Sequence, residues 1–162
     1  NAEYMKKLSS EEFFEKAEPW LKKAISNPAI DLRKVAALVQ SRCEILSDLP
    51  ERVDFIDTLP DYEPELYIHK KSKTNLENSL ETLEVLLPIL QAQEDWSNEA
   101  LYEKLVAIAT DRGVKNSVIL WPLRVAVSGK ASTPGGATEL CALLGKEESL
   151  ARIEKGIELL RK

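Results

Sequence analysis

The stretch Trp121–Gly136, WPLRVAVSGKASTPGG, is the most informative part of this chain of 162 residues. A helical run that carries Arg124 leads into a short loop, and the sequence TPGG then predicts a new helix. Thr133 is a favourable N-cap, and Pro134 suits the first helical position because its missing N–H costs nothing there. A helix start presents unbonded N–H groups and a small positive pole, and Lys130 is near in sequence. This combination suits a nucleobase or a phosphate; an ordinary helix–loop–helix joint is the alternative.

The rest of the chain also shows helical spacing of apolar residues, and no segment alternates convincingly as a strand. A capping box of Ser9 with Glu12 and an N-cap at Asp31 mark two helix starts, and Gly113 marks a helix end. The segment Leu59–His69 has two prolines and clustered acids, which predicts a linker. We therefore predict an all-α fold, with helices over residues 9–24, 31–46, 50–56, 76–90, 97–113, 117–127, 134–144 and 147–160.

Composition sets limits on the class of protein. The chain is 44% hydrophobic and 30% charged, which is typical of a soluble globular protein. It has no apolar run of about 18 residues, and its N-terminus is too charged for a signal peptide, so no membrane partner is predicted. Cys43 and Cys141 are far apart, which favours separate reduced thiols and the cytoplasm. With His69 as the one histidine and no CxxC pair, no metal site is predicted.

Charge is unevenly distributed along a chain whose net charge is −5. Residues 77–103 contain seven acids and no lysine or arginine, whereas residues 110–136 contain Arg112, Lys115, Arg124 and Lys130 against the single acid Asp111. The first stretch would repel a phosphate backbone and the second would attract it. Two solvated helix faces are the alternative explanation.

Catalytic motifs are missing from the sequence. It contains neither a GxxxxGK[ST] phosphate loop nor a GxGxxG fingerprint after a strand. Paired acids such as Glu147 and Glu148 fall in the first turns of predicted helices, where they favour the helix dipole. Trp121 is three residues before Arg124 and could share its helix face. These observations favour binding over catalysis in this chain.

Four segments resemble the C-terminal, anticodon-binding part of bacterial-type glutamyl-tRNA synthetases, a group of class I aminoacyl-tRNA synthetases. They are NAEYMKKLSSEEF at the start, SRCEILSDLPE at 41–51, LLPILQAQEDWSNEAL at 86–101 and PLRVAVSGKASTPGGATELCALLGKEESLARI at 122–153. The last is the most specific, because the family has a PLR-x-A-[LV]-[ST]-G run, a [ST]-PG turn and LLGKE in this order. The resemblance covers essentially the whole chain.

The resemblance implies a helical anticodon-binding cage of two small subdomains, which we place at residues 1–62 and 63–162. Such a domain binds the anticodon loop of tRNA(Glu), whose unstacked bases expose their edges. The family's catalytic half, with its HIGH-like and KMSKS-like signatures, is absent from this sequence, so the chain is expected to be a fragment without a catalytic site or cofactor. In the parent ligase, that half attaches glutamate to tRNA(Glu) with ATP and Mg. The resemblance also implies a cytoplasmic protein, and nothing in the sequence suggests more than a monomer.

The family's motifs assign the site residue by residue. Arg42 occupies the arginine position of R-x-x-x-L-x-x-[FL]-P and would contact a base edge, and Arg124, from PLR, would contact a second position. Thr133, Pro134 and the backbone that follows would line the pocket of a base. Gly136 departs from the pattern, since many relatives have a larger apolar residue there, and Trp121 replaces a frequent polar residue with a stacking surface. The residues assigned to the tRNA are therefore Arg42, Arg124, Thr133, Pro134, Gly136 and Trp121 for the anticodon, with Lys115 and Lys130 for phosphates.

These assignments make a structural prediction: Arg42, Arg124 and Thr133 should surround one concave surface where the two subdomains meet. An ion pair of Arg42 with Asp48 or Glu51 is the alternative role for that arginine. Two other functions stay open for the chain. One is a stand-alone helical protein-interaction module that uses its acidic face, and the other is an enzyme in its own right, for which the sequence offers no obvious candidate residues.

Overall fold

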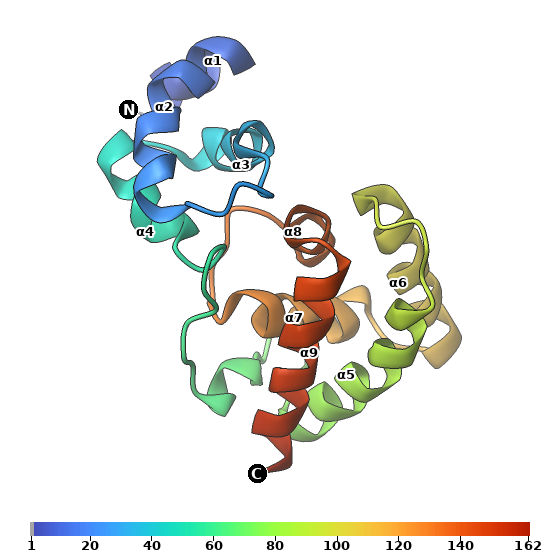
Figure 1. The fold of residues 1–162 in the computed structure, drawn as a ribbon. Helices are drawn as coiled ribbons and strands as arrows, with labels where there is room; N and C mark the ends of the chain where they lie inside the picture. The colour runs from blue at the N-terminus through green and yellow to red at the C-terminus, as the bar shows by residue number, and fades with distance from the viewer. Residues whose placement is uncertain (1) are drawn as a thin grey trace. The chain divides into compact units, whose positions relative to one another are not determined.

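The computed structural model describes residues 2–162, which are helical along most of their length. The helices are α1 (Ala2–Lys7), α2 (Ser10–Ala24), α3 (Leu32–Val39), α4 (Leu49–Val53), α5 (Leu76–Gln91), α6 (Asn98–Arg112), α7 (Asn116–Ser128), α8 (Ala137–Leu144) and α9 (Lys146–Arg161) (Figure 1). Short 3-10 helices cover Gln40–Arg42, Leu46–Asp48 and Pro64–Tyr67. Over these described residues, β pairing is limited to an isolated bridge between His69 and Thr74. The predicted all-α class is confirmed.

The chain forms two compact units, and neither is continuous in sequence. Unit 1 contains the residues up to Thr58 together with Ser132–Gly135, and unit 2 contains Leu59–Ala131 and Gly136–Lys162. The predicted subdomains, 1–62 and 63–162, differ from these units in residues 59–62 and in the segment that returns to unit 1. Nothing in the local sequence of Ser132–Gly135 predicts this return.

Unit 1 is built around α2, which packs against α3 and α4. Its core includes the fully buried side chains of Phe13, Leu21, Val35, Leu49 and Phe55. The predicted helix starts are confirmed: Ser9 and Glu12 form a capping box on α2, and the Asp31 carboxylate accepts the N–H groups of Arg33 and Lys34 at the start of α3.

Helix α3 is shorter than the sequence predicts. It ends at Val39 instead of continuing to residue 46, and the chain passes through the 3-10 helix Gln40–Arg42 into extended backbone at Cys43. The Gln40 amide donates to the main-chain carbonyls of Met5, at 3.0 Å, and Leu8, at 2.9 Å. These contacts with a distant segment outweigh the local helical pattern.

Unit 2 is built from longer helices, with α5 packed against α7 and α9, and α7 packed also against α6 and α8 (Figure 1). The segment predicted as a linker, residues 59–69, is instead part of this unit's core at Tyr67, which is fully buried. Its hydroxyl lies 2.7 Å from that of Tyr62, and burial raises the pKa of Tyr67 well above its usual value. A Cβ at Gly156 of α9 would lie 2.5 Å from the same hydroxyl, so the tyrosine requires glycine there.

Among the helices of residues 2–162, none is both long and apolar enough to cross a membrane.

Candidate functional site

The loop Ser132–Gly135 departs from its predicted conformation. Thr133 is buried, and its hydroxyl donates to the carbonyl of Gly135 at 2.6 Å. Helix α8 begins at Ala137, with Gly136 as its N-cap. The prediction that Thr133 caps this helix and that Pro134 occupies its first position is therefore wrong. The physical reason is that the Thr133 hydroxyl bonds within its own turn while Arg42 binds the Thr133 carbonyl, so this segment is held in a turn and the helix starts after it.

The start of α8 is also less suited to an anion than the sequence predicts. The N–H of Gly136 donates to the Glu139 carboxylate at 2.9 Å. A carboxylate in the first turn already interacts favourably with the positive end of the helix dipole. A phosphate at this position would have to compete with that negative charge, so the helix start by itself is a weak phosphate site.

Arg42 and Thr133 are brought together in unit 1, although they are 91 positions apart. The Arg42 Nη1 donates to the Thr133 carbonyl at 2.7 Å, and the arginine side chain stays exposed at the end of its 3-10 helix. A guanidinium has five N–H donors in a fixed fork, so one hydrogen bond can orient the group while other donors face outward. The partner of Arg42 is a main-chain carbonyl of the loop that contains Thr133 and Pro134, the residues predicted to line the pocket of a base.

Arg124 and Trp121 form a cluster in unit 2. The Arg124 Nη2 donates to the Ala131 carbonyl at 2.7 Å, and its guanidinium lies 4.8 Å from the centre of the Trp121 ring. This contact confirms that the two residues share a helix face. The indole N–H donates to the Leu66 carbonyl at 3.1 Å, and the ring stacks on His69 with centres 3.7 Å apart and an interplanar angle of 5°. His69 thus already occupies a stacking position on the indole that a base was expected to use.

Lys115 and Lys130 lie beyond opposite ends of α7. Lys115 is the exposed N-cap residue of this helix, and Lys130 follows the C-cap Gly129. A helix of 13 residues is about 20 Å long at 1.5 Å per residue. The two lysines can therefore contact two separate phosphates but cannot share one.

The predicted set is divided between the units. Arg42, Thr133 and Pro134 belong to unit 1, and Arg124, Trp121, Gly136, Lys115 and Lys130 belong to unit 2. The concave surface predicted for Arg42, Arg124 and Thr133 joins residues of both units and stays a prediction.

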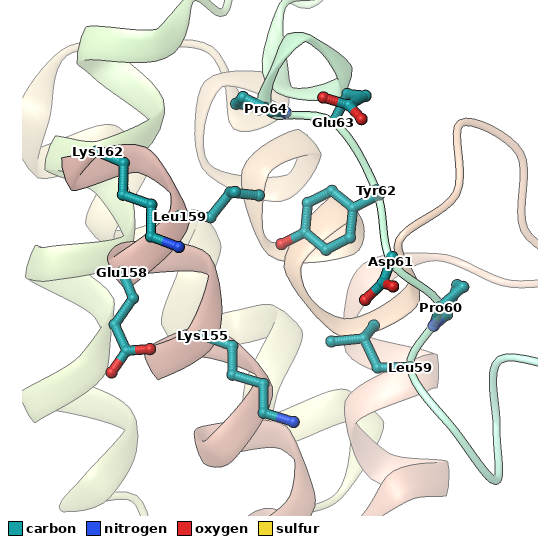
Figure 2. A pocket seen from close by; sticks show the side chains of 10 residues that line it. All are labelled: Leu59, Pro60, Asp61, Tyr62, Glu63, Pro64, Lys155, Glu158, Leu159 and Lys162. Carbon is teal, nitrogen blue, oxygen red and sulfur yellow. The ribbon is translucent and has the colours of Figure 1, made fainter.

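A groove of about 390 Å³ in unit 2 does not contain any of the predicted residues. Figure 2 shows the strap of residues 59–64 on one side and the end of α9 on the other, with the Tyr62 ring pointing toward Leu159. The charged residues that line the groove are Asp61, Glu63, Glu158, Lys155 and Lys162. With acids in the majority, this groove is a poor site for a phosphate backbone.

Sequence reasoning missed a buried arginine on α9. Arg152 is 1% exposed, donates from Nη1 to the Val127 carbonyl at 2.7 Å, and pairs through Nε with Glu148 at 2.8 Å. The available signal was Glu148, an acid one helical turn before Arg152, at the i,i+4 spacing at which an arginine can pair with a carboxylate.

Comparison with known proteins identifies the family of this chain. A family model described as "Anticodon binding domain" matches residues 12–157, and the chain belongs to this family. It is 48% identical over 161 residues to the glutamate–tRNA ligase of Clostridium tetani, covering 99% of this chain and 33% of the relative. It is 49% identical over 162 residues to that of Clostridium acetobutylicum, again covering 33% of the relative. The chain thus spans about a third of the length of these relatives.

A solved structure has the same fold. The glutamate tRNA ligase from Elizabethkingia meningosepticum, in complex with its amino acid, superposes with a TM-score of 0.78 at 22% identity, covering 99% of this chain and 31% of that one. At this identity the likeness concerns the fold.

Proposed function

We propose that this chain binds the anticodon loop of tRNA(Glu) and forms the anticodon-recognising third of a glutamate–tRNA ligase. The observation that carries the proposal is the match to the anticodon binding domain family over residues 12–157. The relatives that are nearly half identical over the full chain are glutamate–tRNA ligases, which gives the amino acid and the tRNA.

The contact between Arg42 and Thr133 supports a site for a base in unit 1. The carbonyl of Thr133 holds the guanidinium at 2.7 Å, so the remaining donors are oriented before the tRNA arrives. Because less side-chain freedom remains to be lost on binding, such an arginine discriminates base edges at a lower entropic cost. Pro134 and the loop backbone line the base beside it.

Arg124 has the equivalent role in unit 2. Its hydrogen bond to the Ala131 carbonyl fixes the guanidinium next to the Trp121 ring. In this arrangement Trp121 supports the arginine, and the backbone at Gly136 offers close approach to a second base. Lys115 and Lys130 contact phosphates, which position the loop without distinguishing its sequence.

In the whole protein, the catalytic half attaches glutamate to the tRNA with ATP and Mg. None of the residues discussed above is assigned to ATP, Mg or glutamate, so this chain contributes recognition of the tRNA. We place the protein in the cytoplasm and propose that it works as a monomer.

The test is binding of this chain to unmodified tRNA(Glu), to the same tRNA with a changed anticodon, and to an unrelated tRNA, at two salt concentrations. We expect weak binding with a preference for the tRNA(Glu) anticodon and a shallow salt dependence, since only a few phosphates are neutralised. Equal affinity for all three RNAs would contradict the proposal and favour the helical protein-interaction module.

A further inference from the structure

The turn between His69 and Thr74, with the sequence HKKSKT, carries three lysines that the predicted tRNA site does not include. Lys70, Lys71 and Lys73 are all exposed. The turn is closed by two main-chain hydrogen bonds between its ends, from the His69 N–H to the Thr74 carbonyl at 3.3 Å and from the Thr74 N–H to the His69 carbonyl at 3.1 Å. A lysine-rich tip is thus displayed on a closed turn.

Polar side chains fix this turn from the inside. The Ser72 side chain is buried, with its hydroxyl 2.7 Å from the His69 Nδ1, and the buried Thr74 hydroxyl donates to the Tyr67 carbonyl at 2.8 Å. The amide of Asn78 donates to the Lys73 carbonyl at 3.0 Å. The polar residues of the turn therefore point inward, and its lysines point to solvent.

Lys73 has a left-handed backbone, with φ at +61°. Glycine and asparagine adopt this conformation most readily, and other residues pay a conformational cost there. A lysine at this position is unfavourable for the turn itself, which is consistent with a role for its charge.

The turn lies beside the segment of unit 2 that carries the predicted tRNA contacts. The Ser117 hydroxyl in the first turn of α7 donates to the Ser72 carbonyl at 3.2 Å, and Lys115 is two residues earlier. At the other end of the turn, His69 stacks on Trp121, whose ring also contacts Arg124. One indole ring therefore separates the turn from the arginine assigned to a base.

Charge supports the same surface. Residues 66–76 and 113–124, which these contacts join, contain four lysines and one arginine and no acid. Acids border this surface at Glu65, directly before the first range, at Glu77 in the first turn of α5, at Glu81, which pairs with Arg112, and at Asp111 near the end of α6. This is a local excess of positive charge in a chain whose net charge is −5.

We propose that Lys70, Lys71 and Lys73, together with Lys115, bind the phosphate backbone of an RNA next to the residues that contact its bases. This lysine surface contributes affinity and orientation, because phosphate contacts fix register whereas base contacts carry sequence information. RNA is the ligand that the structure favours, because the turn is joined through the His69–Trp121 stack to the arginine assigned to a base. The inference rests on the proposed function.

The test neutralises the turn in the full chain, with the substitutions Lys70→Gln, Lys71→Gln and Lys73→Gln combined. A matched control combines Lys104→Gln, Lys155→Gln and Lys162→Gln, which are exposed lysines of the same unit and give the same change in net charge. Binding to tRNA(Glu) and to tRNA(Glu) with a changed anticodon is measured over a range of salt concentrations, and melting temperatures verify that both variants are folded.

We expect the turn variant to lose about tenfold or more in affinity for both RNAs. The slope of log K against log salt should become shallower by about two, because each lost phosphate contact reduces the magnitude of this slope by roughly 0.7–0.9. The preference between the two RNAs should stay the same, and the control should change the slope much less. A turn variant that binds both RNAs like the control overturns the inference, and the proposed function stands if the wild type still prefers the tRNA(Glu) anticodon.

The proposed function can also fail while the phosphate surface is supported. If the wild type shows no anticodon preference but the turn variant binds RNA more weakly than the control and with a flatter slope, the proposed function fails and the phosphate surface is supported. A changed preference with an unchanged slope would overturn the phosphate role.

Discussion

Unit 1 and unit 2 stabilise their backbone in different ways. In unit 1, polar side chains reach across to the main chain of loops: the Asp57 carboxylate accepts the N–H groups of Ser26, at 2.8 Å, and Asn27, at 3.3 Å, and Arg42 donates to the Thr133 carbonyl. In unit 2, long helices pack through a larger apolar core, and a fully buried Arg152 joins α9 to the end of α7. Unit 2 also has side-chain bonds to the main chain of loops, such as that from Arg124 to the Ala131 carbonyl, so the clearest difference between the units is the larger apolar core and the buried arginine of unit 2.

One arginine in each unit shows the difference between an exposed and a buried hydrogen bond. Arg42 and Arg152 each donate to a main-chain carbonyl at 2.7 Å, but Arg42 is exposed whereas Arg152 is 1% exposed. The same hydrogen bond has two consequences. In the interior it satisfies a buried carbonyl and contributes to stability, while at the surface it orients a cation whose other donors can contact a ligand.

The largest effect is expected from Arg152→Met. The methionine fills part of the volume, but the Val127 carbonyl loses its donor in a buried environment, so the free energy of unfolding should fall by about 3 kcal/mol. Urea unfolding of the chain measures this change. A loss below about 0.5 kcal/mol, within the range of an ordinary surface substitution, would contradict the structural role of Arg152.

Next in size is Arg42→Ala, which tests the surface side of the comparison. By analogy with base-edge contacts in DNA, discrimination at one anticodon position should fall about ten- to a hundredfold, with little change in melting temperature. Binding to anticodon stem-loops substituted at each position measures this. Arg33→Ala is the control, because Arg33 is an exposed arginine of unit 1 that pairs with Glu11.

The competing role for Arg42 gives a different result. If Arg42 only stabilises the loop at Thr133, its loss should lower the melting temperature and weaken binding of every anticodon equally. That outcome would remove Arg42 from the residues that recognise a base.

A smaller effect is expected from pH on unit 1. Partial burial raises the pKa of Asp57, but the hydrogen bonds from Ser26 and Asn27 outweigh it, and the net pKa lies below the usual value of 3.8. Since the folded state favours the carboxylate, this stabilisation is complete above the unfolded-state pKa, about 3.9. It is lost as the pH falls through the lower pKa of the folded state.

Asp57→Asn tests this link between charge and stability. The variant should be less stable than the wild type at pH 7, by about 1 kcal/mol. The difference should shrink as the pH falls below about 4, because the carboxyl of the wild type then becomes protonated in the unfolded state, and at still lower pH also in the folded state. Urea unfolding at pH 7 and pH 3 measures both values; a difference that is the same at the two pH values would contradict the role of the charged form.

The smallest effects are expected from the single substitutions Lys115→Ala and Lys130→Ala. Each should weaken binding of all tRNAs alike, by about two- to fivefold, and reduce the salt slope by about one. Because the lysines are beyond opposite ends of α7, their effects should add in the double variant. A change in preference between tRNAs without a change in slope would contradict the phosphate role.

Local signals predicted the helices of both units well. Ser9, Asp31 and Ser97 cap helices because their side chains accept N–H groups within three residues, and Gly113 ends α6 with φ at +67°. These helix starts and ends are set by residues that are neighbours in sequence, so they can be predicted from the sequence alone. Thr133 has the residue type of a cap but does not act as one, because its segment is held in a turn by its own hydroxyl bond to the Gly135 carbonyl and by the bond from the distant Arg42.

Contacts between distant residues set the limits of the prediction. The family's motifs assigned both Arg42 and Thr133 to the site, but no local pattern indicates that one donates to the other's carbonyl. The end of α3 at Val39 likewise depends on Gln40 binding the carbonyls of Met5 and Leu8. His69, which the composition left without a role, stacks on Trp121 only because the fold brings two segments together.

The return of Ser132–Gly135 to unit 1 has a consequence for how this protein is made. A ribosome adds about 5–20 residues per second, so the 91 positions between Arg42 and Thr133 correspond to a wait of roughly 5 to 18 s. During that time the helices of unit 1 can form, but Arg42 has no carbonyl to bind until most of unit 2 has been synthesised. The order of synthesis therefore makes the loop at Thr133 one of the last parts of the first unit to assemble.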